Sequence, residues 1–362
     1  MAPSSPPIAP VSVVVQEYPT QPHTPLPGVD PIYNVVESIA ATLRHTASVL
    51  RELARVTFDD DVDNSTLARR SGEIREYLRS HFPDIKFVAC ADPKTHAWHK
   101  RGGEAAFQVR DRRNVKHTIF VNFSLYGSLN HALTCRAPCG DIHDNPNYKH
   151  FLSFLLHVCL LHELGHIVRT VFASRPTPPR YSLLSDTSTG EAGFHVERGV
   201  LGGAVVVGYH TESADKSFVL EWENAVCVGF CQPDGEIRWL SWAQREHPLW
   251  AIFRRGAIYR VIQHVGSLPT EMNDYPLDTV ARLSSINSTS TSGDPCGSVG
   301  DKPESTIYPV EPVSPSPGIH PTSSTTSLLC LPSSATLTTG LLGLPGEDRE
   351  IFVDYRSTPD VI

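Results

Sequence analysis

Two histidines and a glutamate in the segment His162-Glu163-Leu164-Gly165-His166 have the residue types and the spacing of a metal site. Residues four apart on an α-helix lie one turn above each other on the same face, so both imidazoles can point at one ion. Glu163 lies between them, where its carboxylate can reach a water molecule held by that ion. The segment therefore predicts zinc ligands at His162 and His166 and a general base at Glu163.

The residues before the motif predict a buried helix. Residues 151–161 are almost wholly apolar, and Ile167-Val168 continue the apolar run. A helix that is hydrophobic on nearly every side belongs in a core. Two buried histidines with a glutamate need compensation for their lost hydration, and a metal ion is the simplest one. The alternative is an ordinary core helix in which each polar side chain finds an unrelated partner. We predict this helix over residues 148–172, before the prolines at 176, 178 and 179.

Composition limits the classes of function. The 362 residues carry a net charge of −8, and no basic stripe interleaved with aromatic residues appears, which argues against nucleic-acid binding. No basic region followed by an apolar core opens the chain, and residues 151–161 are too short to span a bilayer. These features predict an intracellular protein, cytoplasmic or nuclear, without a membrane span. In such a compartment the 8 cysteines are expected to be free thiols.

The uneven composition predicts one α+β domain between two disordered ends. Residues 1–30 are rich in proline, and residues 284–362 are dominated by Ser, Thr, Pro and Gly. The predicted domain covers residues 31–283. Its helices are expected at 31–55, 66–82, 125–133, 148–172, 188–201, 242–254 and 258–264, and its strands at 85–90, 105–110, 115–123, 204–209, 225–230 and 236–240. Residues 111–114 are predicted to be the turn of a hairpin between 105–110 and 115–123.

A third protein ligand is expected, because catalytic zinc takes three and keeps one position open. A metzincin would have Gly at 169 and His at 172, whereas the chain has Arg169 and Phe172. A glutamate on the following helix remains. Glu191 has the spacing of a capping box with Ser188, which already accounts for its carboxylate. Glu197 lies mid-helix on an apolar face, where a cation would offset its burial. We therefore favour Glu197 over Glu191, with His195 as a lesser candidate.

This arrangement resembles the gluzincin branch of the zincin metallopeptidases. The segment from Gly190 to Glu197, followed by Gly202-Gly203, also resembles uncharacterised fungal proteins of the H-E-x-x-H type. The resemblance implies a zincin-like fold, with a small mixed sheet packed on the H-E-x-x-H helix, and zinc ligands at His162, His166 and one downstream glutamate. The chain departs from the best-known gluzincin pattern, which has Asn-Glu or Glu-x-x-x-Asp around the third ligand.

The function implied is a zinc-dependent peptide hydrolase acting on a peptide or protein substrate. Zinc lowers the pKa of a bound water from about 15.7 towards about 7, and Glu163 would take its proton and hand it to the leaving amine. Candidate oxyanion donors downstream are Tyr209, His210 and Arg238. By the same resemblance, residues 115–123 are the edge strand that aligns an extended peptide.

The alternative function is a non-catalytic zinc-binding domain of the same fold, or a scaffold whose proline-rich tails recruit partners. The tail segment Pro312-Val313-Ser314-Pro315-Ser316-Pro317 is a candidate for such an interaction. The number of protein ligands separates the two functions, because four would indicate a structural metal and three an open position for chemistry.

Overall fold

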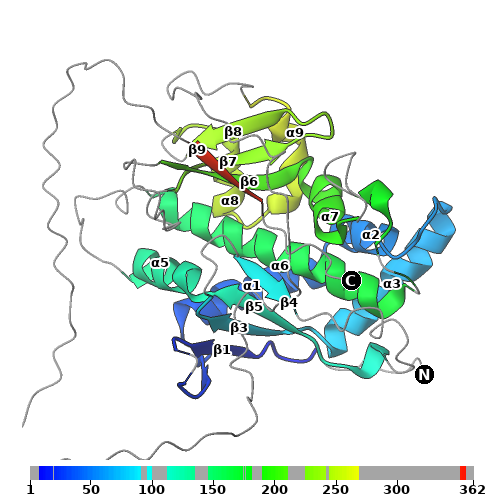
Figure 1. Cartoon of the computed structure of the whole chain (residues 1–362), viewed down its shortest axis with the longest axis horizontal. Helices are drawn as coiled ribbons and strands as arrows, with labels where there is room; N and C mark the ends of the chain where they lie inside the picture. Colours follow the sequence, from blue (N-terminus) through cyan, green and yellow to red (C-terminus); the bar gives the residue numbers. More distant parts are fainter. Residues whose placement is uncertain are drawn as a thin grey trace, which may run out of the picture. The chain divides into compact units, whose positions relative to one another are not determined.

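The computed structural model describes residues 8–18, 20–90, 96–99, 112–134, 146–173, 175, 177–181, 190–210, 225–241, 244–268 and 351–355, and for 209, 210, 226 and 351–355 only the backbone. These residues belong to one unit, formed by Met1–Gly297 and Arg349–Ile362, and the second unit, Ser298–Asp348, lies outside them. Within the described part, the fold is mixed α/β with eight α-helices and two sheets (Figure 1).

The first sheet is mixed and has five strands in the order β2-β1-β3-β5-β4. Its strands are β1 (Val13–Gln16), β2 (Thr24–Pro25), β3 (Asp84–Val88), β4 (Ala97–His99) and β5 (Thr118–Asn122). β1, β3 and β5 are parallel, and β2 and β4 pair antiparallel at the two ends. Ile85, Phe87, Ile119 and Val121 alternate along β3 and β5 and are fully buried on the core side.

Two predictions for this part of the chain are wrong. Residues 13–16 and 24–25 are strands, although residues 1–30 were predicted to be disordered; the valines at 13–15 pair with both β2 and β3. β5 is paired on both of its edges, so it is not the edge strand of the sheet. Residues 105–110, the other predicted arm of the hairpin, lie outside the described residues, and 112–114 form a 3-10 helix, η1 (Arg112–Asn114). Among the described strands, β4 is the end strand.

Three helices precede β3. They are α1 (Pro31–His45), α2 (Ala47–Arg55) and α3 (Asn64–Ser80). Asp30 caps α1, because its Oδ1 accepts a hydrogen bond from the Ile32 N–H at 2.7 Å. The single helix predicted over 31–55 is broken at Thr46, whose backbone is extended. The break allows α2 to pack on α7 (Ala192–Leu201), whereas α1 packs on α5 (Phe123–Thr134).

Helix α6 (Tyr148–Phe172) is the central element, and its predicted bounds are confirmed. Every residue from Phe154 to Val171 is buried. α6 packs against β4 and β5 on one side, and Phe154 contacts Phe230 of the second sheet with ring centroids 6.2 Å apart (Figure 1). The helix is long and apolar enough to cross a membrane, but 94% of its most apolar window is buried inside the protein. It is therefore the core helix that its all-round hydrophobicity indicates.

The second sheet is antiparallel and has the order β8-β7-β6-β9. Its strands are β6 (Ala204–His210), β7 (Ala225–Cys231), β8 (Ile237–Ser241) and β9 (Ile351–Tyr355). The first three were predicted. β9 lies within residues 284–362, which were predicted to be disordered, and it pairs with the edge of β6 that faces away from β7. The rest of that range lies outside the described residues. The final helices, α8 (Pro248–Arg254) and α9 (Ile262–Val265), are shorter than predicted, and η5 (Ile258–Arg260) lies between them.

The cysteines differ in part from the expectation of free thiols. Cys159, Cys227 and Cys231 are free and buried, as expected. Cys90, which follows β3, is disulfide-bonded. Disulfides persist in oxidising surroundings, so the argument from a reducing compartment does not hold for Cys90. Cys135 and Cys139 lie outside the described residues.

Candidate metal centre

α6 brings His162 and His166 together in the core, as their spacing predicts. The two side chains are each 1% exposed, and their Nε2 atoms lie 3.2 Å apart. The ring of Phe194, on α7, packs edge-on against His162 with centroids 4.9 Å apart. The two imidazoles are therefore held in place by packing, with their Nε2 atoms directed at one point.

Close packing of α7 on α6 depends on two glycines. A Cβ on Gly165, inside the motif, would lie 3.1 Å from the carbonyl oxygen of Ala192. A Cβ on Gly193 would overlap the His162 ring. α7 then ends at Gly202, whose φ of 80° suits a residue without a side chain. These small residues place the first turn of α7 against the motif.

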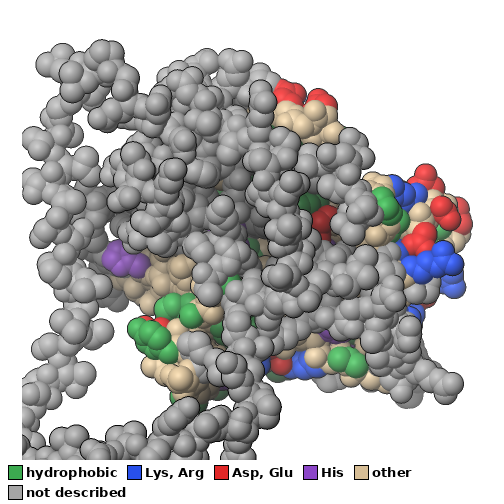
Figure 2. All heavy atoms as spheres, viewed as in Figure 1, with side chains coloured by type: hydrophobic (Ala, Val, Ile, Leu, Met, Phe, Trp, Pro, Cys, Tyr) green, Lys and Arg blue, Asp and Glu red, His purple; other side chains and the backbone are tan. Residues whose placement is uncertain are grey.

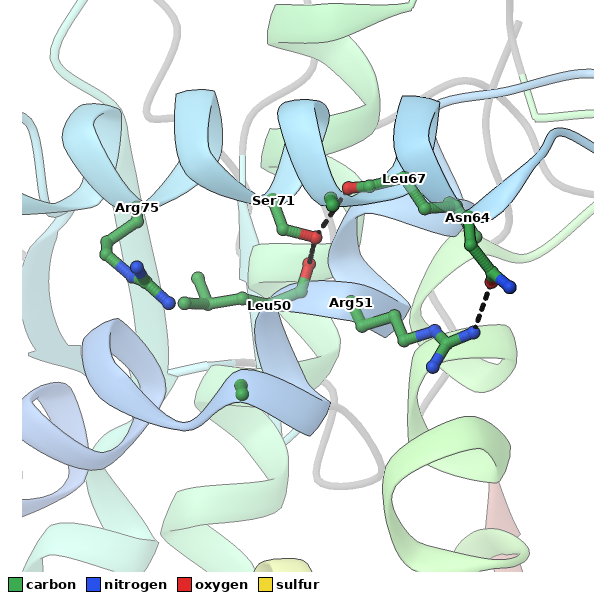
Figure 3. Close-up of a pocket in the computed structure, with 8 residues that line it drawn as sticks. Leu50, Arg51, Asn64, Leu67, Ser71 and Arg75 are labelled. Atoms are coloured by element: carbon green, nitrogen blue, oxygen red, sulfur yellow. Dashed lines mark hydrogen bonds between the residues drawn. The ribbon is translucent and has the colours of Figure 1, made fainter.

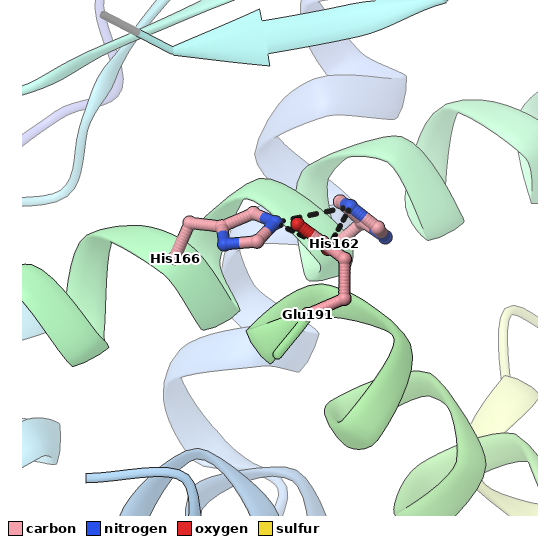
Figure 4. A group of neighbouring side chains, drawn as sticks. All are labelled: His162, His166 and Glu191. Atoms are coloured by element: carbon pink, nitrogen blue, oxygen red, sulfur yellow. Dashed lines mark hydrogen bonds and ion pairs between the residues drawn. The ribbon is translucent and has the colours of Figure 1, made fainter. Parts of the chain in front are cut away.

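Glu191 completes a group of three with the two histidines (Figure 4). Its Oε2 lies 2.8 Å from His166 Nε2 and 3.2 Å from His162 Nε2. Donor atoms that share one tetrahedral ion at metal–ligand distances of 2.0–2.1 Å are about 3.3 Å apart. The edges of this triangle, 2.8, 3.2 and 3.2 Å, are close to that value. The buried group could therefore bind a metal ion, and among the described residues it comprises these three.

Glu197 lies beside this group in a different role from the one we favoured. Its Oε1 is 2.6 Å from His162 Nδ1, the ring nitrogen opposite the group, and its Oε2 accepts a hydrogen bond from the Val205 N–H at 2.6 Å. A histidine that binds a metal through one nitrogen commonly donates from the other to a carboxylate, which fixes its tautomer and orientation. The geometry therefore favours Glu191 as the third ligand and Glu197 as the partner that orients His162.

The arrangement differs from the preference for Glu197 at the start of α7. The capping box was expected to engage Glu191 with Ser188, which lies outside the described residues. Instead Glu191 is itself the N-cap residue, with an extended backbone, and its side chain does not cap the helix. From that position the carboxylate reaches both Nε2 atoms. His195 is one turn further along α7, where its ring packs on Tyr181 with centroids 4.1 Å apart.

The electrostatics of the site favour positive charge. Burial opposes protonation of His162, but hydrogen bonds and charges from Glu191 and Glu197 raise its pKa to about 10. Burial likewise opposes ionisation of Glu191, but the neighbouring His166 and His162 hold the pKa of that carboxyl well below its ordinary value. Two buried carboxylates thus face the imidazoles, and a divalent cation bound there would compensate their charge.

Glu163 points to a residue that the sequence did not predict. Its Oε2 lies 2.9 Å from Nδ1 of His99 on β4, and each side chain is 2% exposed. His99 is 64 residues away along the chain. The segment Ala97-Trp98-His99 carries no motif, so only the pairing of β4 with β5 could have located it.

The candidate oxyanion donors are placed only in part. Tyr209 and His210 belong to β6, but their side chains lie outside the described part of the structure. Arg238 lies on β8, where its guanidinium donates to the Gly266 carbonyl at 2.8 Å and pairs with Glu236 at 3.6 Å. In this arrangement Arg238 links β8 to the turn after α9.

A cavity of about 290 Å³ between α2 and α3 offers less chemistry (Figure 3). Arg51 and Arg75 flank its apolar floor, and Arg51 donates to Asn64 Oδ1 at 2.7 Å. The Ser71 hydroxyl is 2.8 Å from the Leu67 carbonyl and 3.3 Å from that of Leu50. Its one hydroxyl is therefore engaged with the backbone rather than activated.

The charges on the described surface near α3 are mixed in sign. Glu73 pairs with Arg70 at 3.5 Å and with Arg113 at 3.3 Å, and Glu76 pairs with Arg79 at 3.7 Å. On the face drawn in Figure 2, Lys/Arg and Asp/Glu side chains lie next to one another in the same way. Among the described residues, the group formed by His162, His166 and Glu191 is therefore the strongest candidate for a functional site.

Comparisons with protein-family models, with curated proteins and with solved structures gave no significant match.

Proposed function

We propose that the protein is a zinc-dependent peptide hydrolase with a zincin-like, gluzincin-type site. The observation that carries this proposal is the triangle formed by His162 Nε2, His166 Nε2 and Glu191 Oε2, with edges of 2.8 to 3.2 Å. Two imidazoles and one carboxylate are a donor set typical of catalytic zinc, and three protein ligands leave a position for water or substrate. Zinc held there supplies Lewis acidity that polarises a carbonyl and acidifies water.

The chain's own residues supply the rest of the chemistry. Glu163, directly after His162, is a buried carboxylate beside the group, and it acts as the general base that takes a proton from the attacking water and delivers it to the leaving amine. Glu197 holds His162 in one tautomer and orientation.

The arrangement of the first sheet also supports the proposal. β4, the end strand among the described strands of the mixed sheet, packs on α6 and is antiparallel to its neighbour β5. An end strand offers main-chain groups to which an extended peptide can pair. β4 therefore takes the place that we first assigned to residues 115–123, and a peptide or protein substrate would lie along it.

The experiment uses the purified full-length chain. We expect about one zinc per chain by elemental mass spectrometry, and cleavage of fluorescein-labelled casein. Glu163→Gln is expected to retain the zinc and to lose the cleavage, because an amide cannot take the proton. Glu73→Gln, at a surface carboxylate on α3, is the matched control and should leave both unchanged.

Two results would contradict the proposal. A native chain that takes up no added zinc would show that these residues do not form a metal site. A Glu163→Gln variant with undiminished cleavage would show that Glu163 is not the general base. Zinc bound without cleavage would favour the non-catalytic alternative, which a fourth protein ligand in a metal-bound structure would establish.

A further inference from the structure

Contacts on two sides fix the ring of His99 beside the candidate metal ligands. The β4–β5 ladder sets its backbone, with His99 opposite Ile119. Its ring stacks on that of His166, with centroids 5.8 Å apart and an angle of 26° between the planes. Its Nδ1 meets Glu163 Oε2 at 2.9 Å. The ring therefore has a defined orientation, set by a strand far from the motif in sequence.

When the carboxylate is ionised, the hydrogen bond between His99 and Glu163 can have only one donor. A carboxylate only accepts, so Nδ1 of His99 carries the proton and donates it. A buried carboxylate without such a donor would bear a large desolvation cost. The bond thus fixes the orientation of the Glu163 carboxylate, and with Oε2 engaged, Oε1 is the oxygen that can accept a proton from water.

His99 differs from the three candidate ligands. Those residues have donor atoms that all lie within 4.8 Å of one another, and His99 is not a member of that group. Its contacts with the site include the hydrogen bond to Glu163 and the ring stack on His166. The hydrogen bond is the contact through which His99 can orient the carboxylate.

We propose that His99 is a positioning residue that holds Glu163 in the orientation required of a general base. The inference rests on the proposed hydrolase function. It also links the end strand to the chemistry, because β4 presents both the edge along which a peptide would pair and the imidazole that orients the base. A replacement at His99 should therefore lower kcat and leave KM nearly unchanged, since the bond is made to Glu163 rather than to substrate.

Two replacements separate the hydrogen bond from the packing. His99→Phe keeps a planar ring against His166 but removes the donor, whereas His99→Asn places an amide N–H near the position of Nδ1. His96→Leu, at a buried histidine just before β4, is the matched control. Zinc content and kinetics on one quenched fluorescent peptide that the wild type cleaves are measured for each. The free energy of a hydrogen bond to a charged group corresponds to a change in rate of about 10- to 100-fold. We therefore expect kcat of His99→Phe to be lower than that of the wild type by this factor.

A second readout does not depend on turnover. Acetohydroxamate binds the metal of such sites and transfers a proton to the base, so its affinity for the cobalt-substituted protein, followed by visible absorption, reports on Glu163. We expect the affinity to fall in His99→Phe, to recover in His99→Asn and to be unchanged in His96→Leu. Should His99→Phe fail to fold, the wild-type chain still provides a test, because the low-field N–H resonance of His99 should move upfield in Glu163→Gln, where the acceptor is a neutral amide.

The outcomes separate the two proposals. If His99→Phe binds zinc and keeps wild-type kcat and hydroxamate affinity, His99 does not position the base, and the hydrolase proposal stands. An imidazole resonance unaffected by Glu163→Gln would also overturn the inference. If the wild type binds neither zinc nor cobalt, both proposals fall.

Discussion

The two glutamates of α7 should differ sharply in their effect on zinc affinity. In the proposed site, Glu191 is a ligand and Glu197 is the acceptor that orients His162. We compare Glu191→Gln with Glu197→Gln, because both remove one negative charge and change the side-chain volume little. The pair therefore tests position rather than charge.

The magnitude for Glu197→Gln follows from its two hydrogen bonds. The carboxylate is fully buried, and it accepts from His162 Nδ1 and from the Val205 N–H, both at 2.6 Å. An amide has one acceptor oxygen, so one of these donors would face an NH₂ group. An unsatisfied buried donor costs about 1–3 kcal/mol of folding free energy. Loss of such an orienting partner lowers metal affinity about 10- to 100-fold.

Glu191→Gln should lower zinc affinity beyond that range, by more than about 100-fold, because the donor itself is weakened rather than its orienting partner. Zinc affinity is measured by competition with a fluorescent chelator at pH 7.5, and thermal unfolding in EDTA gives the stability of the metal-free variants. Glu236→Gln, at a surface ion pair, is the control.

The ranking of the two variants decides the assignment. If Glu197→Gln loses more zinc affinity than Glu191→Gln, the ligand is Glu197, and the reasoning from the triangle of donor atoms is refuted. Equal losses within a factor of two would show that neither glutamate is a ligand in preference to the other.

Two further predictions concern packing and pH. Gly193→Ala should lower zinc affinity and cost about 1–3 kcal/mol of stability, because the added methyl overlaps the His162 ring; Gly72→Ala, with nothing within 4 Å of the new methyl, should leave zinc affinity unchanged. Burial lowers the pKa of His157 to about 3. Below the unfolded pKa of about 6.5, the unfolded chain binds a proton that buried His157 does not. The free energy of unfolding therefore decreases as the pH is lowered, by about 2 kcal/mol at pH 5. His157→Leu should therefore lose less stability than the wild type between pH 8 and pH 5 in urea unfolding, and an equal loss would contradict this cause.

The helical part of the fold was predictable because its signals are local. The bounds of α6 follow from a largely apolar run that ends before Pro176, and the start of α1 follows from Asp30 and Pro31. β1 and β9 were missed because their neighbours in sequence are rich in proline or in small polar residues. Their stability comes from pairing with β3 and β6, which lie far away in the chain.

The spacing of His162, Glu163 and His166 was enough to determine that two imidazoles and a carboxylate share one helix, because helical periodicity is a property of neighbouring residues. Only the tertiary structure decided which glutamate faces the Nε2 atoms and that His99 meets Glu163. Those choices depend on where α7 and β4 lie against α6. Such placement is set by close packing between distant segments, as at Gly165 and Gly193, and no local pattern in the chain encodes it.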